Sequence, residues 1–116
     1  MNSDYVKPIA IRILTELKSD SIKLLNWDAK DFCYLNRNIG YKCYPALMFD
    51  ISDKIVKNGK IIISYEKVLD SYIVELTKSS RDKEVILKKK DKIYLDDLPK
   101  ILDEMLVTDK PLKKVV

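Results

Sequence analysis

Carboxylates are the residues of this 116-residue chain that could do chemistry, because the sequence contains no histidine. The missing imidazole removes the commonest general acid and base at neutral pH and the base of Ser–His and Cys–His nucleophile pairs. Carboxylates close in sequence, together with a lysine, are the groups that a metal-dependent hydrolase or nuclease would use. The close acidic pairs are Asp28 and Asp31, Asp50 and Asp53, Asp96 and Asp97, and Asp103 and Glu104.

The spacing of charged residues does not fit a nuclease-like pattern in which an acidic residue is followed by Glu-x-Lys. Glu66-Lys67 lacks the spacer, and Asp82-Lys83-Glu84 has its lysine on the wrong side. Two glycines cannot build a GxGxxG or GxxxxGK[ST] phosphate loop, and the two cysteines without histidine cannot form a zinc site within one chain. We therefore expect no enzyme and no cofactor, and a metal-dependent hydrolase or nuclease ranks third among the functions considered.

Basic residues form the second chemical feature. The chain has 22 Lys and Arg against 18 Asp and Glu, a net charge of +4. The segment 78–92 alone has seven basic and three acidic residues, so its excess equals that of the whole chain. A basic hairpin there could bind nucleic-acid phosphates, or its lysines could only keep an edge strand from aggregating. The basic residues are Lys78, Arg81, Lys83, Lys88, Lys89, Lys90 and Lys92.

Aromatic residues gather between positions 27 and 44. Tyrosine and tryptophan are enriched at protein interfaces, although they are also common as half-buried residues of a core. This part of the chain is the best candidate for a surface that binds another protein. Its members are Trp27, Phe32, Tyr34, Tyr41 and Tyr44.

Both ends of the domain have the apolar spacing of amphipathic helices. Apolar residues recur every three to four positions from Val6 to Leu17, with Ser3 or Asp4 as a possible N-cap. The same spacing recurs from Leu98 to Leu106, where Asp96 or Asp97 can cap the helix. Each stripe predicts a helix that packs one face against a core.

The segment 19–45 permits two interpretations. Residues 21–25 fit a short helical turn, which Trp27 would anchor to the core. Beyond it, 28–33 could form a short capped helix. Alternatively, strands 32–35 and 41–44 could pair around a turn at 36–40, which would place Cys33 roughly opposite Cys43.

Asn58-Gly59 also permits two interpretations. Between apolar runs, Asn-Gly favours a two-residue type I′ hairpin turn, with a strand at 54–57 before it. The alternative is a helix over 52–57 that ends at Gly59 in the left-handed conformation. We favour the hairpin because isoleucine and valine dominate the segment.

Alternating apolar residues predict two further strands, 72–77 and 84–88. A four-residue loop at 79–82 would place Leu76 opposite Val85 and Val74 opposite Leu87. Both apolar sets would then lie on one sheet face, which predicts an antiparallel meander.

These patterns predict one α+β domain over 1–108. It would be an antiparallel meander of three to five strands with an N-terminal and a C-terminal helix packed on one face. Residues 109–116 would form a short, mobile basic tail. No apolar run approaches the roughly 20 residues of a membrane span, and no signal peptide is evident, so we expect a cytoplasmic protein with Cys33 and Cys43 reduced.

The residues resemble no known family. The absence of catalytic motifs and the aromatic cluster favour a small, non-enzymatic interaction protein that binds another protein or itself. Nucleic-acid binding through 78–92 is the alternative, and a membrane partner is not expected.

Overall fold

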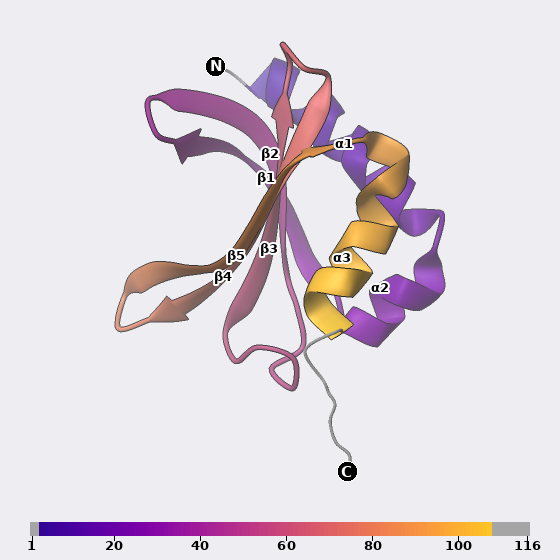
Figure 1. Ribbon diagram of the computed structural model, residues 1–116, viewed down its shortest axis with the longest axis vertical. Coiled ribbons are helices and arrows are strands. Elements are labelled where there is room, and N and C mark those ends of the chain that lie inside the picture. Colours follow the sequence, from indigo (N-terminus) through magenta and orange to yellow (C-terminus); the bar gives the residue numbers. More distant parts are fainter. Residues whose placement is uncertain (1–2, 108–116) are drawn as a thin grey trace.

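The computed structural model describes residues 3–107, which form a five-stranded antiparallel sheet and three α-helices (Figure 1). The strands follow one another as a meander in the order β1-β2-β3-β4-β5, which confirms the expected α+β architecture. The predicted basic tail lies outside the described residues. The elements are α1 (Ser3–Lys18), α2 (Ser21–Trp27), β1 (Lys30–Ile39), β2 (Lys42–Asp50), β3 (Gly59–Glu66), β4 (Ser71–Ser80), β5 (Lys83–Ile93), a short 3₁₀ turn (Leu95–Asp97) and α3 (Leu98–Val107).

All three helices lie on the same side of the sheet (Figure 1). Helix α1 packs across β1 and β2, and its predicted stripe from Val6 to Leu17 is buried except for Leu14, which is half-buried. Leu98 and Leu102 of α3 are fully buried in the same core, as the sequence predicts. No helix among residues 3–107 is long and apolar enough to cross a membrane.

The helical turn predicted at 21–25 is part of the longer helix α2, which continues to Trp27. Its N-terminus is capped by Asp20, whose carboxylate accepts the Lys23 N–H at 3.4 Å. Trp27 at its end is only 1% exposed, and its indole N–H donates to Asp103 of α3 at 3.2 Å. Trp27 therefore joins α2 to α3 within the core, as an anchor for this connection.

The hairpin interpretation of the segment after Trp27 is correct. β1 and β2 pair around a two-residue turn, Gly40-Tyr41, in which Gly40 has φ +63°. The expected position of the two cysteines is wrong, however, because Cys33 pairs with Met48 and Cys43 pairs with Asn38. The strands are longer than predicted and the turn is shorter, so the two thiols lie at opposite ends of the hairpin.

Pro45 explains why the β1–β2 hairpin projects from the sheet. Pairing between β2 and β3 ends at Ala46 and Ser64, immediately beside Pro45. A proline has no N–H to donate to the next strand, so the ladder stops there. Residues 42–45 therefore pair only with β1, and this end of the hairpin bends away from the helices (Figure 1, upper left).

The strand predicted at 54–57 is wrong. Residues 51–58 form the connection between β2 and β3, in which the N–H groups of Ile55 and Val56 both donate to the Ser52 carbonyl, at 2.9 and 3.1 Å. This single helical turn is nearer to the alternative interpretation, but Asn58, with φ +57°, is its left-handed residue. Gly59 begins β3 instead. Its backbone passes so close to Val56 that a Cβ would lie 2.8 Å from the Val56 Cβ, which favours glycine at this position.

The predicted meander of β4 and β5 is present, but its predicted register is wrong. Leu76 pairs with Lys88 rather than Val85. The loop has two residues, Arg81 and Asp82, at φ +53° and +64°, and a bulge follows in β5 between Ile86 and Lys88. The apolar residues in the first half of β5 therefore miss the core, and three consecutive side chains are exposed: Val85, Ile86 and Leu87.

Candidate functional site

The strand order makes β1 and β5 the two edges of the sheet. One side of each edge strand has no neighbouring strand within residues 3–107. Unpaired backbone N–H and C=O groups on such an edge can accept a further strand, so natural proteins usually protect their edges with charge, bulges or short strands. The two edges of this sheet differ greatly in such protection.

The β5 edge is protected. Register shifts interrupt its pairing with β4 at two places, and Lys92 adopts a left-handed φ of +57°. Bulges twist an edge away from a possible partner, and lysines raise the cost of covering it. The lysines of this strand are Lys83, Lys88, Lys89, Lys90 and Lys92.

The β1 edge is protected only at its beginning, where a register shift lies between Lys30 and Cys33 and Asp31 adopts a left-handed φ of +56°. From Cys33 to Ile39 it pairs with β2 without a register shift. This seven-residue stretch contains no lysine, no acidic residue and no proline, and its one charged residue is Arg37. It therefore presents the regular, nearly uncharged edge that strand addition requires.

The hydrogen-bond pattern shows which backbone groups β1 directs outward. A two-residue turn is closed by a hydrogen-bonded pair, here Ile39 and Lys42, and hydrogen-bonded and non-hydrogen-bonded pairs alternate from there. Asn36 and Pro45 thus form a non-hydrogen-bonded pair, which suits a proline without an N–H. The backbone groups of alternate residues from Tyr34 to Asn38 therefore point away from β2.

An apolar groove runs beside the β1 edge. One hollow of about 100 Å³ lies between α1 and β1 and includes Leu14 and Tyr34, and a second of about 470 Å³ lies beside α2 and includes Leu24 and Ala29. Phe32 lines both hollows, and we call the two together the β1 groove. Its three most exposed apolar side chains are Ile11 at 52%, Leu25 at 79% and Tyr34 at 45%.

The predicted aromatic surface is only partly assembled. Phe32 and Tyr34 line the β1 groove, where the Phe32 ring packs on Phe49 with centroids 4.9 Å apart. Trp27 is instead part of the core, Tyr41 stands fully exposed at the hairpin turn, and Tyr44 is half-buried. By the alternation of the strands, Tyr44 lies on the sheet face opposite the helices.

Sequence reasoning missed the helical members of the groove. Ile11, Leu24 and Leu25 were outside the aromatic cluster that marked the segment. Ile11 is a large apolar residue on the polar side of the α1 stripe. Alone, such a residue is ordinary on a protein surface, and it becomes informative only beside the other members of the groove.

Two carboxylates neutralise Arg37, the one charged residue of the β1 edge between Cys33 and Ile39. Its guanidinium contacts Glu75 of β4 at 2.9 and 3.1 Å and Glu84 of β5 at 2.7 and 3.0 Å. Hydrogen bonding to Glu75 is the largest cause that raises the pKa of Arg37 above its ordinary value, and burial opposes it. The cation is thus held on the sheet face opposite the helices, by this chain's own groups.

The predicted basic residues do not form one patch. By register, Lys83, Lys88 and Lys90 point toward the helix side of the sheet, whereas Lys89 lies opposite Glu75 on the other face. Lys88 is half-buried, and its ammonium donates to the Met105 carbonyl at 3.1 Å. The remaining members are also spread along the hairpin: Lys78 is half-buried in β4, Arg81 lies in the turn, and Lys92 is exposed near the end of β5.

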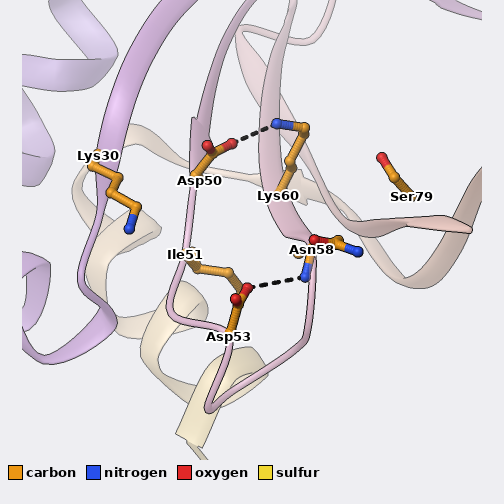
Figure 2. Close-up of a pocket in the computed structure, with 8 residues that line it drawn as sticks. Lys30, Asp50, Ile51, Asp53, Asn58, Lys60 and Ser79 are labelled. Atoms are coloured by element: carbon orange, nitrogen blue, oxygen red, sulfur yellow. Dashed lines mark hydrogen bonds and ion pairs between the residues drawn. The ribbon is translucent and has the colours of Figure 1, made fainter.

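Asp50 and Asp53 lie in a polar hollow of about 320 Å³, but they bind different partners (Figure 2). Asp50 forms an ion pair with Lys60, and Asp53 accepts the backbone N–H of Asn58 at 3.1 Å. Within residues 3–107, no three Asp, Glu or Cys side chains cluster closely enough to hold a metal ion.

Comparison with models of protein families, with curated proteins and with solved structures gave no match for this chain.

Proposed function

We propose that this chain is a non-enzymatic interaction protein that binds another protein chain, or a second copy of itself, by adding a strand to β1. The observation that carries this proposal is the regular edge from Cys33 to Ile39, with Arg37 as its one charged residue, beside the β1 groove. The outward backbone groups of β1 would bind the main chain of the added strand. The groove would cover its apolar side chains, and together these are the two elements of strand-addition recognition.

Three exposed apolar side chains beside one edge support this proposal. Isolated apolar residues on a surface are ordinary, but a contiguous apolar surface usually marks an interaction site. Ile11, Leu25 and Tyr34 come from three different elements and meet at the same groove.

A matched pair of lysine substitutions tests the site. Tyr34→Lys places a charge on the β1 edge, and Ile86→Lys places the same charge on the β5 edge at a residue of similar exposure. Proteins that bind the tagged wild-type chain in extracts of its own cells should also bind Ile86→Lys and should be lost from Tyr34→Lys. Equal binding by both variants would contradict the β1 site, and so would the absence of any specifically bound chain, whether a different protein or an untagged copy of this one.

Nucleic-acid binding by the β4–β5 hairpin is the second function we propose to test. The basic hairpin projects from the body of the domain (Figure 1, lower left), and Lys89 and Lys90 are exposed. Binding through phosphates would weaken steeply with salt and would be abolished by Lys89→Glu with Lys90→Glu. The proposal fails if duplex and single-stranded DNA and RNA all remain unbound at low salt.

The cytoplasm is the compartment we propose for this interaction. Cys33 and Cys43 are both free and exposed. Exposed thiols persist in the reducing cytosol, whereas secreted proteins usually carry their cysteines as disulfides.

A further inference from the structure

We infer that the nucleic acid bound by the β4–β5 hairpin is a duplex of any base sequence, held through its phosphates by the helix-side face of the hairpin. This inference rests on the second function proposed above, and it names the ligand and the face that contacts it. Three properties of the hairpin support it. They are the distribution of charge over its two faces, the length of its row of lysines, and the residue types that 78–92 lacks.

Most lysines of the hairpin gather on its helix-side face. Val74 and Leu76 of β4 are buried beneath the helices, and alternate residues further along β4 point to the same side. A residue of β5 shares the face of its partner on β4, so the register assigns each paired lysine to one face or the other. The lysines on the helix side, which together we call the lysine face, are Lys78, Lys83, Lys88 and Lys90.

The opposite face of the hairpin has no excess of charge. Glu75 and Glu84 lie on it, and both bind the guanidinium of Arg37. Lys89 pairs with Glu75 in the register of the two strands and therefore shares this face. Two carboxylates and two cations cancel, so this side of the hairpin attracts a polyanion little.

The remaining charged residues of 78–92 form neighbouring pairs of opposite sign. Arg81 and Asp82 occupy the turn, and Asp91 and Lys92 lie near the end of β5. Lys89 and Glu84 cancel on the opposite face. The whole excess of +4 in this segment, which equals the net charge of the chain, therefore lies on the lysine face.

The lysine face is an extended row. Its end residues, Lys83 and Lys90, pair with β4 residues six positions apart, which is about 20 Å at about 3.3 Å per residue. Glu104 of α3 borders the inner end of the row, where it lines a hollow of about 460 Å³ together with Lys90. A duplex rises about 3.4 Å per base pair, so the row faces the phosphates of about six base pairs. This length suits an extended polyanion better than a single small anion.

Three of the four lysines are available to bind phosphates. Lys78, Lys83 and Lys90 form no ion pair within residues 3–107, and the last two are exposed. Lys88 donates to the Met105 carbonyl instead. Each phosphate contact lowers log K by about 0.9 per unit of log salt concentration, so three contacts predict a slope of about −2.7.

The residue types of 78–92 argue against other modes of nucleic-acid recognition. The segment contains no phenylalanine, tryptophan or tyrosine, on which the bases of single strands stack. It contains no asparagine or glutamine and one arginine, the side chains that commonly read base edges in pairs of hydrogen bonds. A lysine ammonium is a point charge that attracts phosphate whatever the neighbouring base is. The hairpin is therefore suited to the regular backbone of a duplex.

Fluorescence anisotropy with the purified full chain tests the inference over a series of salt concentrations. The probes are two labelled duplexes of about 12 base pairs with unrelated sequences, and the separate strands of each. We expect both duplexes to bind equally, with a salt slope of about −2.7, and the single strands to bind more weakly.

Two adjacent lysines provide the matched variants. Lys89 and Lys90 are both exposed but lie on opposite faces of the hairpin. Lys90→Gln should reduce the magnitude of the salt slope by about 0.9, and Lys83→Gln should do the same. Lys89→Gln should leave the slope unchanged. Urea unfolding of each variant verifies that its fold is retained.

The outcomes separate this inference from nucleic-acid binding itself. An equal loss of slope in Lys89→Gln and Lys90→Gln overturns the assignment to the lysine face, and tighter binding of single strands or of one sequence overturns the duplex as ligand. In both cases the hairpin still binds nucleic acid. If no probe binds at low salt, the function on which the inference rests fails as well. Binding to vesicles of phosphatidylserine and phosphatidylcholine that Lys90→Gln weakens would then assign the lysine face to a membrane surface.

Discussion

The guanidinium of Arg37 on β1 donates two hydrogen bonds to the carboxylate of Glu75 on β4, although β2 and β3 lie between these strands in the sheet. The Glu75 side chain is 1% exposed. The contact is possible because the sheet is strongly twisted, so its two outer hairpins bend toward the face opposite the helices (Figure 1). Glu84 on β5 accepts the remaining hydrogen bonds of the guanidinium.

Replacing Arg37 should strongly destabilise the domain. Arg37→Met leaves the Glu75 carboxylate buried without its cation, and we expect the free energy of unfolding in urea to fall by about 3–5 kcal/mol. The double variant Arg37→Met with Glu75→Leu removes the stranded charge and should recover much of that loss. If the double variant is no more stable than Arg37→Met alone, Glu75 is not held as the structure shows.

Removing Asp103, the acceptor of the Trp27 indole N–H, should lower the stability of the domain while the tryptophan itself is unchanged. Asp103→Ala leaves this buried donor unsatisfied, and we expect a loss of about 1–3 kcal/mol in urea unfolding followed by Trp27 fluorescence. Asp103→Asn keeps an acceptor oxygen and is the matched control. Equal stability of the alanine and asparagine variants would show that the hydrogen bond contributes nothing.

Gly59 and the adjacent Asn58 should differ in their response to substitution. Gly59→Ala introduces a Cβ at 2.8 Å from the Val56 Cβ and 2.9 Å from its carbonyl oxygen, and should lower the free energy of unfolding by about 1–3 kcal/mol. Asn58→Gly should be nearly neutral, because Asn58 already adopts the left-handed φ that glycine tolerates. Thermal and urea midpoints give the comparison. A neutral Gly59→Ala would contradict the close approach to Val56.

Alkaline pH should weaken the fold through Tyr72. Burial is the largest cause that raises the pKa of Tyr72 above its ordinary 10.0. The unfolded chain then loses this proton first, so the stabilising contribution is complete below about pH 10 and is lost as pH rises toward the folded-state pKa. We expect Tyr72→Phe to lose less stability than the wild type in urea melts between about pH 8 and pH 11. Parallel decline of both proteins would remove Tyr72 as the cause.

Local patterns in the sequence were sufficient for the helices and the meander. The stripe from Val6 to Leu17 needs only one covering surface, and the sheet provides it. Turn chemistry was less informative. Arg81-Asp82 forms a two-residue hairpin turn with both φ angles positive, although neither residue is glycine. Asn58-Gly59 was the expected hairpin turn, but it does not form one, and Gly59 begins β3. At Gly59, the close approach to Val56 outweighed the local preference.

The β1 groove could not be predicted because it depends on strand order. Phe32 and Tyr34 were identified by residue type, but their neighbours Ile11 and Leu25 come from separate helices. Nothing in the local pattern shows that β1 is an edge or that the lysines of 78–92 face two sides of the sheet. These properties arise only when all five strands are in place.

The long reach of Arg37 has a consequence for the order of folding. Each strand pairs with its neighbour in sequence, so the hairpins can form from local contacts while the chain is being synthesised. The carboxylates that bind Arg37 lie 38 and 47 residues further along. A growing chain that has completed only β1 and β2 therefore presents an uncompensated cation on its open edge, which opposes premature association between nascent chains. This charge is neutralised once β4 and β5 have been synthesised, at the stage when the rest of the core can form.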